Sequence, residues 1–190
     1  MKKFWDKAIS FEEYFKKTEE VVAKNETELT KEEKEMLEYY KLGVQRMSRM
    51  LKVYEPDAAQ LQKLKEKNFS GKILIISEGW CGDAGQTVPA VSLFFKGHNE
   101  VRIAYRDENP ELIDQFLTNG TRSIPIVVIL DENDNVITHW GPRPAYGNEL
   151  LKKYKADPEN YPKEQFYNDL QVYYSKNRGK DTIDEIIELL

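Results

Sequence analysis

The sequence predicts an α/β fold in which a central mixed β-sheet is flanked by helices and a helical extension precedes the sheet. Two observations support this prediction. Up to residue 69 the apolar side chains recur three and four residues apart, which is the spacing of amphipathic helices. From Lys72 onward, short β-branched runs alternate with helical segments, a pattern typical of layered α/β structures. The 190 residues suffice for one domain with a buried core and an extension.

Helix-start signals divide the extension into three helices. Ser10 with Glu13, and Thr30 with Glu33, have the spacing of capping boxes. Pro56 is expected to start the third, short helix, because proline is favoured at a first helical position. The pattern therefore predicts two helices after the capping residues and a third after the proline.

The extension, residues 1–69, is too small to be stable alone without a metal or a disulfide. We therefore expect its apolar faces to pack on a domain formed by residues 70–190. Residues 68–71 form the predicted joint, and the sequence contains no linker long enough to separate two freely moving domains.

The domain at 70–190 begins with a strand and a helix whose start is marked by Asp83 and Gln86, again at capping-box spacing. In chain order we expect a strand at 73–76, a helix near 84–96, a strand at 101–105, a helix starting at 107–112, a strand at 126–130, a turn at 131–135, a strand ending at 141, and helices at 144–156, 163–177 and 182–190.

Composition argues against several functional classes. A net charge of −5 disfavours a nucleic-acid partner, whose phosphates favour a basic face. The longest uncharged apolar run, residues 124–130, is far shorter than the roughly 20 residues of a membrane-spanning helix. Asp6, Glu12 and Glu13 interrupt the segment that a signal peptide would need. We therefore expect a cytoplasmic protein, and the single cysteine, Cys81, suits a reducing compartment.

Metal and cofactor motifs are absent from the sequence. His98 and His139 are too sparse for a metal cluster. The sequence contains no P-loop and no dinucleotide-binding fingerprint. No metal and no cofactor are therefore expected.

Four short motifs within residues 72–141 resemble the thioredoxin superfamily. Trp80-Cys81-Gly82 matches the start of that family's active site, and Pro89 lies where its first long helix carries a kinking proline. Ile124-Pro125 matches its cis-proline dipeptide, and Gly141 falls at its glycine after the last hairpin. The resemblance implies a three-layer α/β/α thioredoxin fold. The full motif, Trp-Cys-Gly-Asp-Ala, looks like that of a small bacterial branch described only as thioredoxin-like.

The resemblance also implies a helical insertion. A thioredoxin needs one terminal helix, and the segment at 182–190 looks most like it, so residues 142–179 are interpreted as inserted. Their tyrosine-rich composition suits either a partner surface or ordinary packing. Packing is favoured, because aromatic residues at helical spacing usually bury their rings.

Cys81 is the candidate nucleophile, because it lies just ahead of a predicted helix. Unpaired N–H groups and the positive end of the helix dipole favour thiolate over thiol, and this setting predicts an exposed cysteine that is functional or was formerly functional. Family members carry a second cysteine three residues on, which resolves the mixed disulfide, and here that residue is Ala84. Asp83, where the family commonly has proline, is expected to make Cys81 less acidic.

A second departure concerns proton transfer. The resemblance implies a buried acid in the first strand opposite a lysine in the next, and these positions are Ile75 and Ile103. The site therefore either has lost fast disulfide exchange or is adapted to a reaction that uses a single cysteine.

We interpret the sequence as that of a thioredoxin-like protein with one-cysteine thiol–disulfide chemistry, in which an external thiol resolves the mixed disulfide. Its partner would be a protein or a small-molecule thiol or disulfide, and whether the chain is an enzyme stays open. Pro125 is expected to be cis and to lie opposite Cys81. Besides Cys81, the candidate site residues are Trp80, Gly82, Asp83, Ile124 and Pro125.

The alternative is a redox-inactive adaptor that binds a peptide or a partner protein at the surface of Trp80, Ile124 and Pro125. A third hypothesis, an iron–sulfur cluster shared with glutathione, is weaker. It needs phenylalanine and serine where this chain has Asp83 and Ala84.

Overall fold

The structure, a computed structural model, describes residues 1–190 apart from the side chain of Glu28. The strands are β1 (Lys72–Ser77), β2 (Val101–Tyr105), β3 (Ile126–Leu130) and β4 (Val136–Trp140). The helices are α1 (Lys2–Trp5), α2 (Phe11–Val22), the 3-10 helix η1 (Glu26–Glu28), α3 (Lys31–Val53), α4 (Ala58–Lys67), α5 (Ala84–Phe95), α6 (Pro110–Ile113), α7 (Ala145–Ala156), α8 (Lys163–Asn177) and α9 (Lys180–Leu189).

The four strands form one mixed sheet in the order β2-β1-β3-β4. β1 runs parallel to β2 and antiparallel to β3, and β3 runs antiparallel to β4. Strands β1 and β3 are buried along almost their whole length, which their unbroken β-branched runs require. The predicted α/β fold, with a central mixed sheet flanked by helices, is confirmed.

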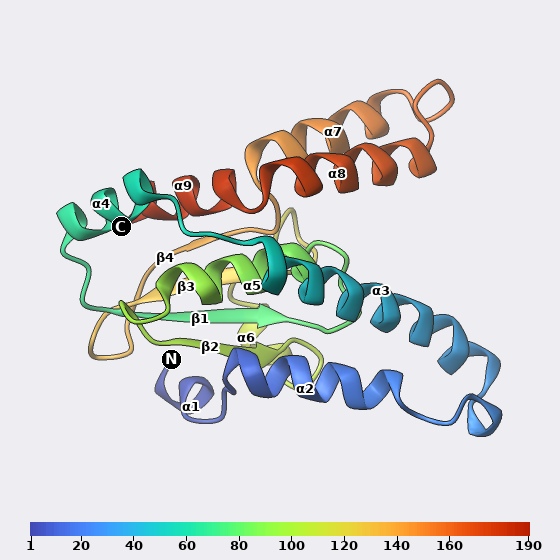
Figure 1. Cartoon of the computed structure of the whole chain (residues 1–190), viewed down its shortest axis with the longest axis horizontal. Helices are drawn as coiled ribbons and strands as arrows, with labels where there is room; N and C mark the ends of the chain where they lie inside the picture. Colours follow the sequence, from blue (N-terminus) through green and yellow to red (C-terminus); the bar gives the residue numbers. More distant parts are fainter.

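Helices cover both faces of the sheet (Figure 1). α5 and α9 pack on one face, where the Trp140 indole donates a 2.6 Å hydrogen bond to Glu185 of α9. The preceding residue, His139, points to the opposite face and meets the ring of Phe116, just beyond α6, at 5.2 Å. Adjacent residues of one strand thus contact the two outer layers, as the period of two requires.

The helix-start signals of the extension are confirmed at two of three positions. Thr30 and Glu33 make both halves of a capping box, and Ser10 accepts from the Glu13 amide. The start predicted at Pro56 is wrong. Asp57 caps α4 instead, with its carboxylate accepting two backbone amides, because an aspartate side chain can satisfy free N–H groups.

Helices α1 to α4 share one hydrophobic core with the sheet. That core includes Phe4, Trp5, Tyr14, Met47 and Leu64 together with the strands. The segment before α2 also pairs with the edge of the sheet, through reciprocal hydrogen bonds between Ile9 and Ile103. A domain division at residues 69 and 70 stays a prediction.

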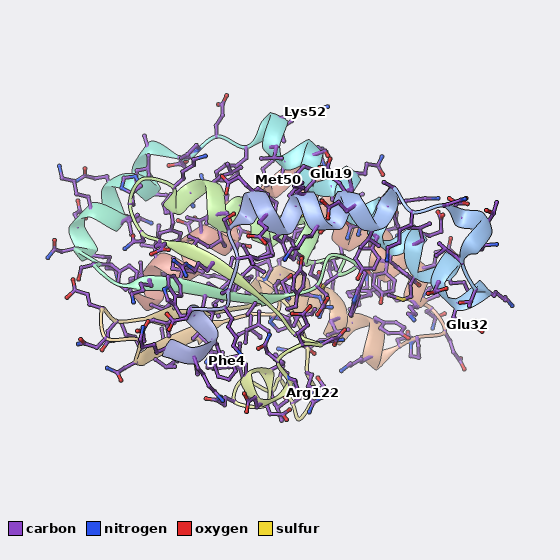
Figure 2. The ribbon with its side chains drawn as sticks, turned by 90° about the horizontal axis from the view of Figure 1, so that it is seen from below. Phe4, Glu19, Glu32, Met50, Lys52 and Arg122 are labelled. Atoms are coloured by element: carbon purple, nitrogen blue, oxygen red, sulfur yellow. The ribbon has the colours of Figure 1, made fainter. Side chains whose placement is uncertain are left out.

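The outer half of α3 extends beyond the sheet together with the end of α2 (Figure 1). Glu32, in the first turn of α3, lies near the tip of this projection (Figure 2). Among the described residues, no helix is both long and apolar enough to cross a membrane.

Helix α3 crosses the loop after β1 at very close range. A Cβ at Gly43 would collide with the carbonyl oxygen of Gly79, and a Cβ at Gly79 would lie 2.8 Å from the Thr18 hydroxyl. Two glycines are therefore needed for this crossing, which places α3 beside the loop that carries Cys81.

Gly43→Ala is expected to destabilise the protein by about 2–3 kcal/mol, because the added methyl group overpacks the crossing. An ordinary helical Gly→Ala change would stabilise by about 0.5–1 kcal/mol, so the predicted sign is opposite. Urea unfolding measures the difference, with Gln45→Ala on the exposed side of α3 as the control. A Gly43→Ala variant as stable as the wild type would contradict the close crossing.

Candidate functional site

The loop between β1 and α5 brings Cys81 to the segment that precedes β3. The Cys81 amide donates to the Glu78 carbonyl at 3.1 Å, and the Cys81 carbonyl accepts from Gly85 at 3.1 Å. The Cys81 thiol donates to the Ile124 carbonyl at 3.4 Å. The peptide bond between Ile124 and Pro125 is cis. The structure therefore places together the two motifs, 43 residues apart, that the sequence singled out.

The thiol of Cys81 is sheltered, and the expectation of an exposed cysteine is wrong. Only 7% of Cys81 is exposed. Burial raises its pKa to about 12, and the nearby Asp83 carboxylate adds to the rise. The amides of Ala84 and Asp83 favour the thiolate, as expected at a helix start, but burial outweighs them.

The expected capping box at Asp83 and Gln86 is also wrong. Asp83 has helical backbone angles and makes no side-chain cap. Only 6% of Asp83 is exposed. Its carboxylate forms a 2.7 Å ion pair with Arg143 and accepts a 2.8 Å hydrogen bond from the Tyr174 hydroxyl. These two partners lie outside the helix, and a buried carboxylate requires such partners.

Burial raises the pKa of the Asp83 carboxyl, while Arg143 and the Tyr174 hydroxyl oppose that rise. Arg46 of α3 contributes a further attraction. Burial also raises the pKa of Tyr174, so its hydroxyl remains a donor across the physiological range. The site thus contains one buried anion surrounded by two guanidinium groups and a phenol.

Gly82 of the motif and Gly85 just after it both lie close to Arg46. A Cβ at Gly82 would lie 2.9 Å from the guanidinium, and a Cβ at Gly85 would lie 3.1 Å from the Arg46 Cβ. Gly82 thus has a packing role in this structure.

Helices α7 and α8 form a hairpin with a small core of their own. Its buried residues are Leu150, Tyr161, Phe166, Leu170 and Tyr174. The hairpin reaches the rest of the protein through Tyr174 at Asp83 and through Ser175, whose hydroxyl and carbonyl accept from Arg49 of α3. Part of the tyrosine-rich composition therefore serves packing, although Tyr146 and Tyr167 remain exposed.

The proposed contact surface is more covered than the sequence suggested. Ile124 and Pro125 are buried. Trp80 is partly buried, and the Arg106 guanidinium lies 4.9 Å from its ring centre. Of these three residues, Trp80 offers the most accessible side chain.

The two isoleucines singled out by the resemblance are direct partners. Ile75 and Ile103 pair across β1 and β2, and both are fully buried. The interior beneath Cys81 therefore has no ionisable group at either position.

Sequence reasoning missed Glu78, a carboxylate just after β1. It is 6% exposed, and its Oε1 accepts from the Asp107 amide at 2.9 Å. Burial raises its pKa to about 7. The position directly after a buried strand was the available signal, but the sequence does not show that α2 and α3 cover this residue. Within the described residues, no group of three His, Cys, Asp or Glu side chains is arranged to hold a metal ion.

Comparisons with known proteins agree with this architecture. A family model described as thioredoxin matches residues 30–155. A crystal structure of a protein of unknown function from Pseudomonas aeruginosa is 16% identical, with a TM-score of 0.62, covering 98% of this chain and 93% of that one. An HIV epitope-scaffold is 17% identical with the same TM-score, covering 98% and 94%. No curated protein matches the chain. The structural similarities support the fold alone.

Tyr174→Phe is expected to destabilise the protein by about 1.5–3 kcal/mol, because it removes a charge-assisted hydrogen bond from the buried Asp83 carboxylate. Tyr167→Phe is the matched control, because that tyrosine is exposed on the same helix, and it should change stability by less than about 0.5 kcal/mol. Denaturant unfolding compares the two. An equal loss of stability in Tyr174→Phe and Tyr167→Phe would mean that the hydrogen bond to Asp83 does not hold α8 in place.

Glu78→Gln is expected to become more stable relative to the wild type as pH rises. The folded pKa of about 7 lies above the unfolded value of about 4.3, so the wild type loses stability as pH rises from the lower value through the higher one. Because water reaches this carboxyl, we expect a relative gain of about 1–2 kcal/mol between pH 5 and 8. Denaturant unfolding at several pH values in this range measures the difference in free energy of unfolding between variant and wild type, with Glu132→Gln as the control. A pH-independent difference would contradict the raised pKa.

Proposed function

The chain belongs to the thioredoxin family, and we propose that it acts as a partner-binding protein of this fold rather than as a disulfide reductase. One observation carries the proposal. The thiol of Cys81 is buried, donates to the Ile124 carbonyl and has a pKa raised to about 12. At neutral pH the thiol is therefore overwhelmingly protonated, whereas the thiolate is the attacking form.

The rest of the site supports the same proposal. Ala84 supplies no resolving thiol, and the buried pair Ile75 and Ile103 cannot transfer a proton. Asp83 pairs with Arg143 and accepts a hydrogen bond from Tyr174 of α8, so its charge helps to attach the hairpin of α7 and α8. The resolving thiol and the buried proton-transfer pair are therefore missing, and the Asp83 carboxylate is engaged elsewhere.

The partner is a peptide or a protein that contacts the face around Trp80. Ile124 and Pro125 are buried, so Trp80 would make most of the side-chain contact. Arg106, stacked on the indole, can contribute charge to the same contact. A cytoplasmic location agrees with the single reduced cysteine.

A second function, one-cysteine exchange, is favoured by the amides of Asp83 and Ala84, which stabilise negative charge on the Cys81 sulfur. In that reaction the thiolate attacks one sulfur of a small disulfide, forms a mixed disulfide and releases the other half as a thiolate. An external thiol then attacks the mixed disulfide, because Ala84 cannot.

Intact mass spectrometry after exposure to a small disulfide decides between the two functions. We expect the native protein at pH 7.5 to form adducts at least about 100-fold more slowly than the urea-unfolded protein, because burial suppresses the thiolate. Cys81→Ser is the control for adducts elsewhere. Fast Cys81 adduct formation by the folded chain, released again by added thiol, would favour one-cysteine exchange and overturn the binding-protein proposal.

A further inference from the structure

A cavity of about 360 Å³ opens beside the carboxyl ends of the parallel strands β1 and β2. Its lining includes Glu78, Lys17, Tyr40, Tyr105, Asp107 and Glu108. The volume lies within the range of about 300–1,000 Å³ typical of small-molecule sites, and the carboxyl ends of parallel strands are where α/β proteins bind ligands. The cavity is therefore suited to a small ligand group by both size and position.

Glu78 indicates the charge of that group. Its side chain lines the cavity and is nine-tenths buried. The Oε1 atom accepts from the Asp107 amide, whereas Oε2 meets no hydrogen-bond donor among the described residues. Oε2 is not among the fully sheltered polar atoms that lack a partner, so water reaches it. A cation that replaced this water would offset the cost of keeping the carboxylate charged in a largely buried position.

The lining offers little positive charge to meet this need. Lys17 forms an ion pair with Glu13 at 3.0 Å, and the nearby Arg106 pairs with Asp107 at 2.7 Å. Glu108 makes no ion pair in the described part of the chain. Glu78 thus has only the Asp107 amide and the attraction of an already paired Arg106 to offset its charge.

Two tyrosines complete the environment. Burial raises the pKa of both Tyr40 and Tyr105, and the negative charge of Glu78 raises both further, so their phenols stay neutral. Neutral aromatic rings beside a carboxylate favour an organic cation, because the ring faces attract positive charge.

We propose that this cavity binds the primary ammonium group of an alkylamine, with Glu78 as its counter-ion. An ammonium is a compact point charge that can contact Oε2 alone, while the Asp107 amide stays on Oε1. The amine comes either from a free alkyldiamine or from the lysine side chain of a protein. The site does not use Cys81, so it stands independently of the function proposed above.

Isothermal titration of the full chain at about pH 8 with cadaverine tests the proposal. We expect cadaverine to bind, and pentanediol, which has the same chain length without charge, not to bind. Glu78→Gln should weaken binding at least tenfold, because it removes the buried counter-charge. Glu132→Gln, at an exposed turn, should bind like the wild type, and Glu108→Gln should weaken binding two- to fivefold.

A blocked tripeptide with a central lysine, and its acetyl-lysine form, separate the two sources of the amine. Binding of cadaverine but not of the lysine peptide assigns the site to free amines, and binding of the peptide with loss on acetylation assigns it to proteins. Equal affinity for cadaverine and pentanediol, or no binding of either amine, would overturn the proposal. If Glu78→Gln does not fold, the comparison of cadaverine with pentanediol on the wild-type protein still tests whether the cavity requires a positive charge. Cys81→Ser should bind cadaverine unchanged, which keeps this test separate from that of thiol reactivity.

Discussion

The buried carboxylate of Asp83 is the interaction on which the arrangement around Cys81 depends. Arg143 follows β4, Tyr174 belongs to α8 and Arg46 belongs to α3, so this carboxylate joins segments far apart in the sequence. Removing a buried charge from water is costly, and only close partners offset the cost. Helix α8 and the segment after β4 must therefore approach the start of α5, and the same approach accompanies the burial of the thiol next to it.

This constraint changes what the family motif does. A cysteine at a helix start ordinarily gains acidity from backbone amides and the helix dipole. In this protein those amides are present, but burial and the neighbouring Asp83 have a larger effect on the Cys81 pKa. The cysteine motif and the cis peptide bond before Pro125 are thus side by side, but the thiol between them stays protonated.

The same loop carries a second buried acid in a different setting. Glu78 is buried in the same loop that leads to Cys81, yet it lines a cavity between α2, α3 and the strand ends. One short loop therefore carries two buried acids, and the charges around their carboxylates differ. Asp83 is surrounded by cations, whereas the free oxygen of Glu78 is directed to a cavity with little unpaired positive charge. The first is suited to holding the protein together and the second to meeting a ligand.

By itself the sequence determined the fold class and most element boundaries, because hydrophobic periodicity and local turn residues specify these features. The placement of the cysteine motif opposite Ile124 and Pro125 followed from the resemblance to the thioredoxin superfamily. Only the tertiary structure decided the state of the site. The exposure of Cys81 depends on how the chain packs around it, and the role of Asp83 depends on Arg143 and Tyr174, which approach from 60 and 91 residues away. Glu78 looks like an ordinary acidic residue in the sequence and acquires its burial from α2 and α3. Charge and accessibility are set by long-range packing, which local patterns do not encode.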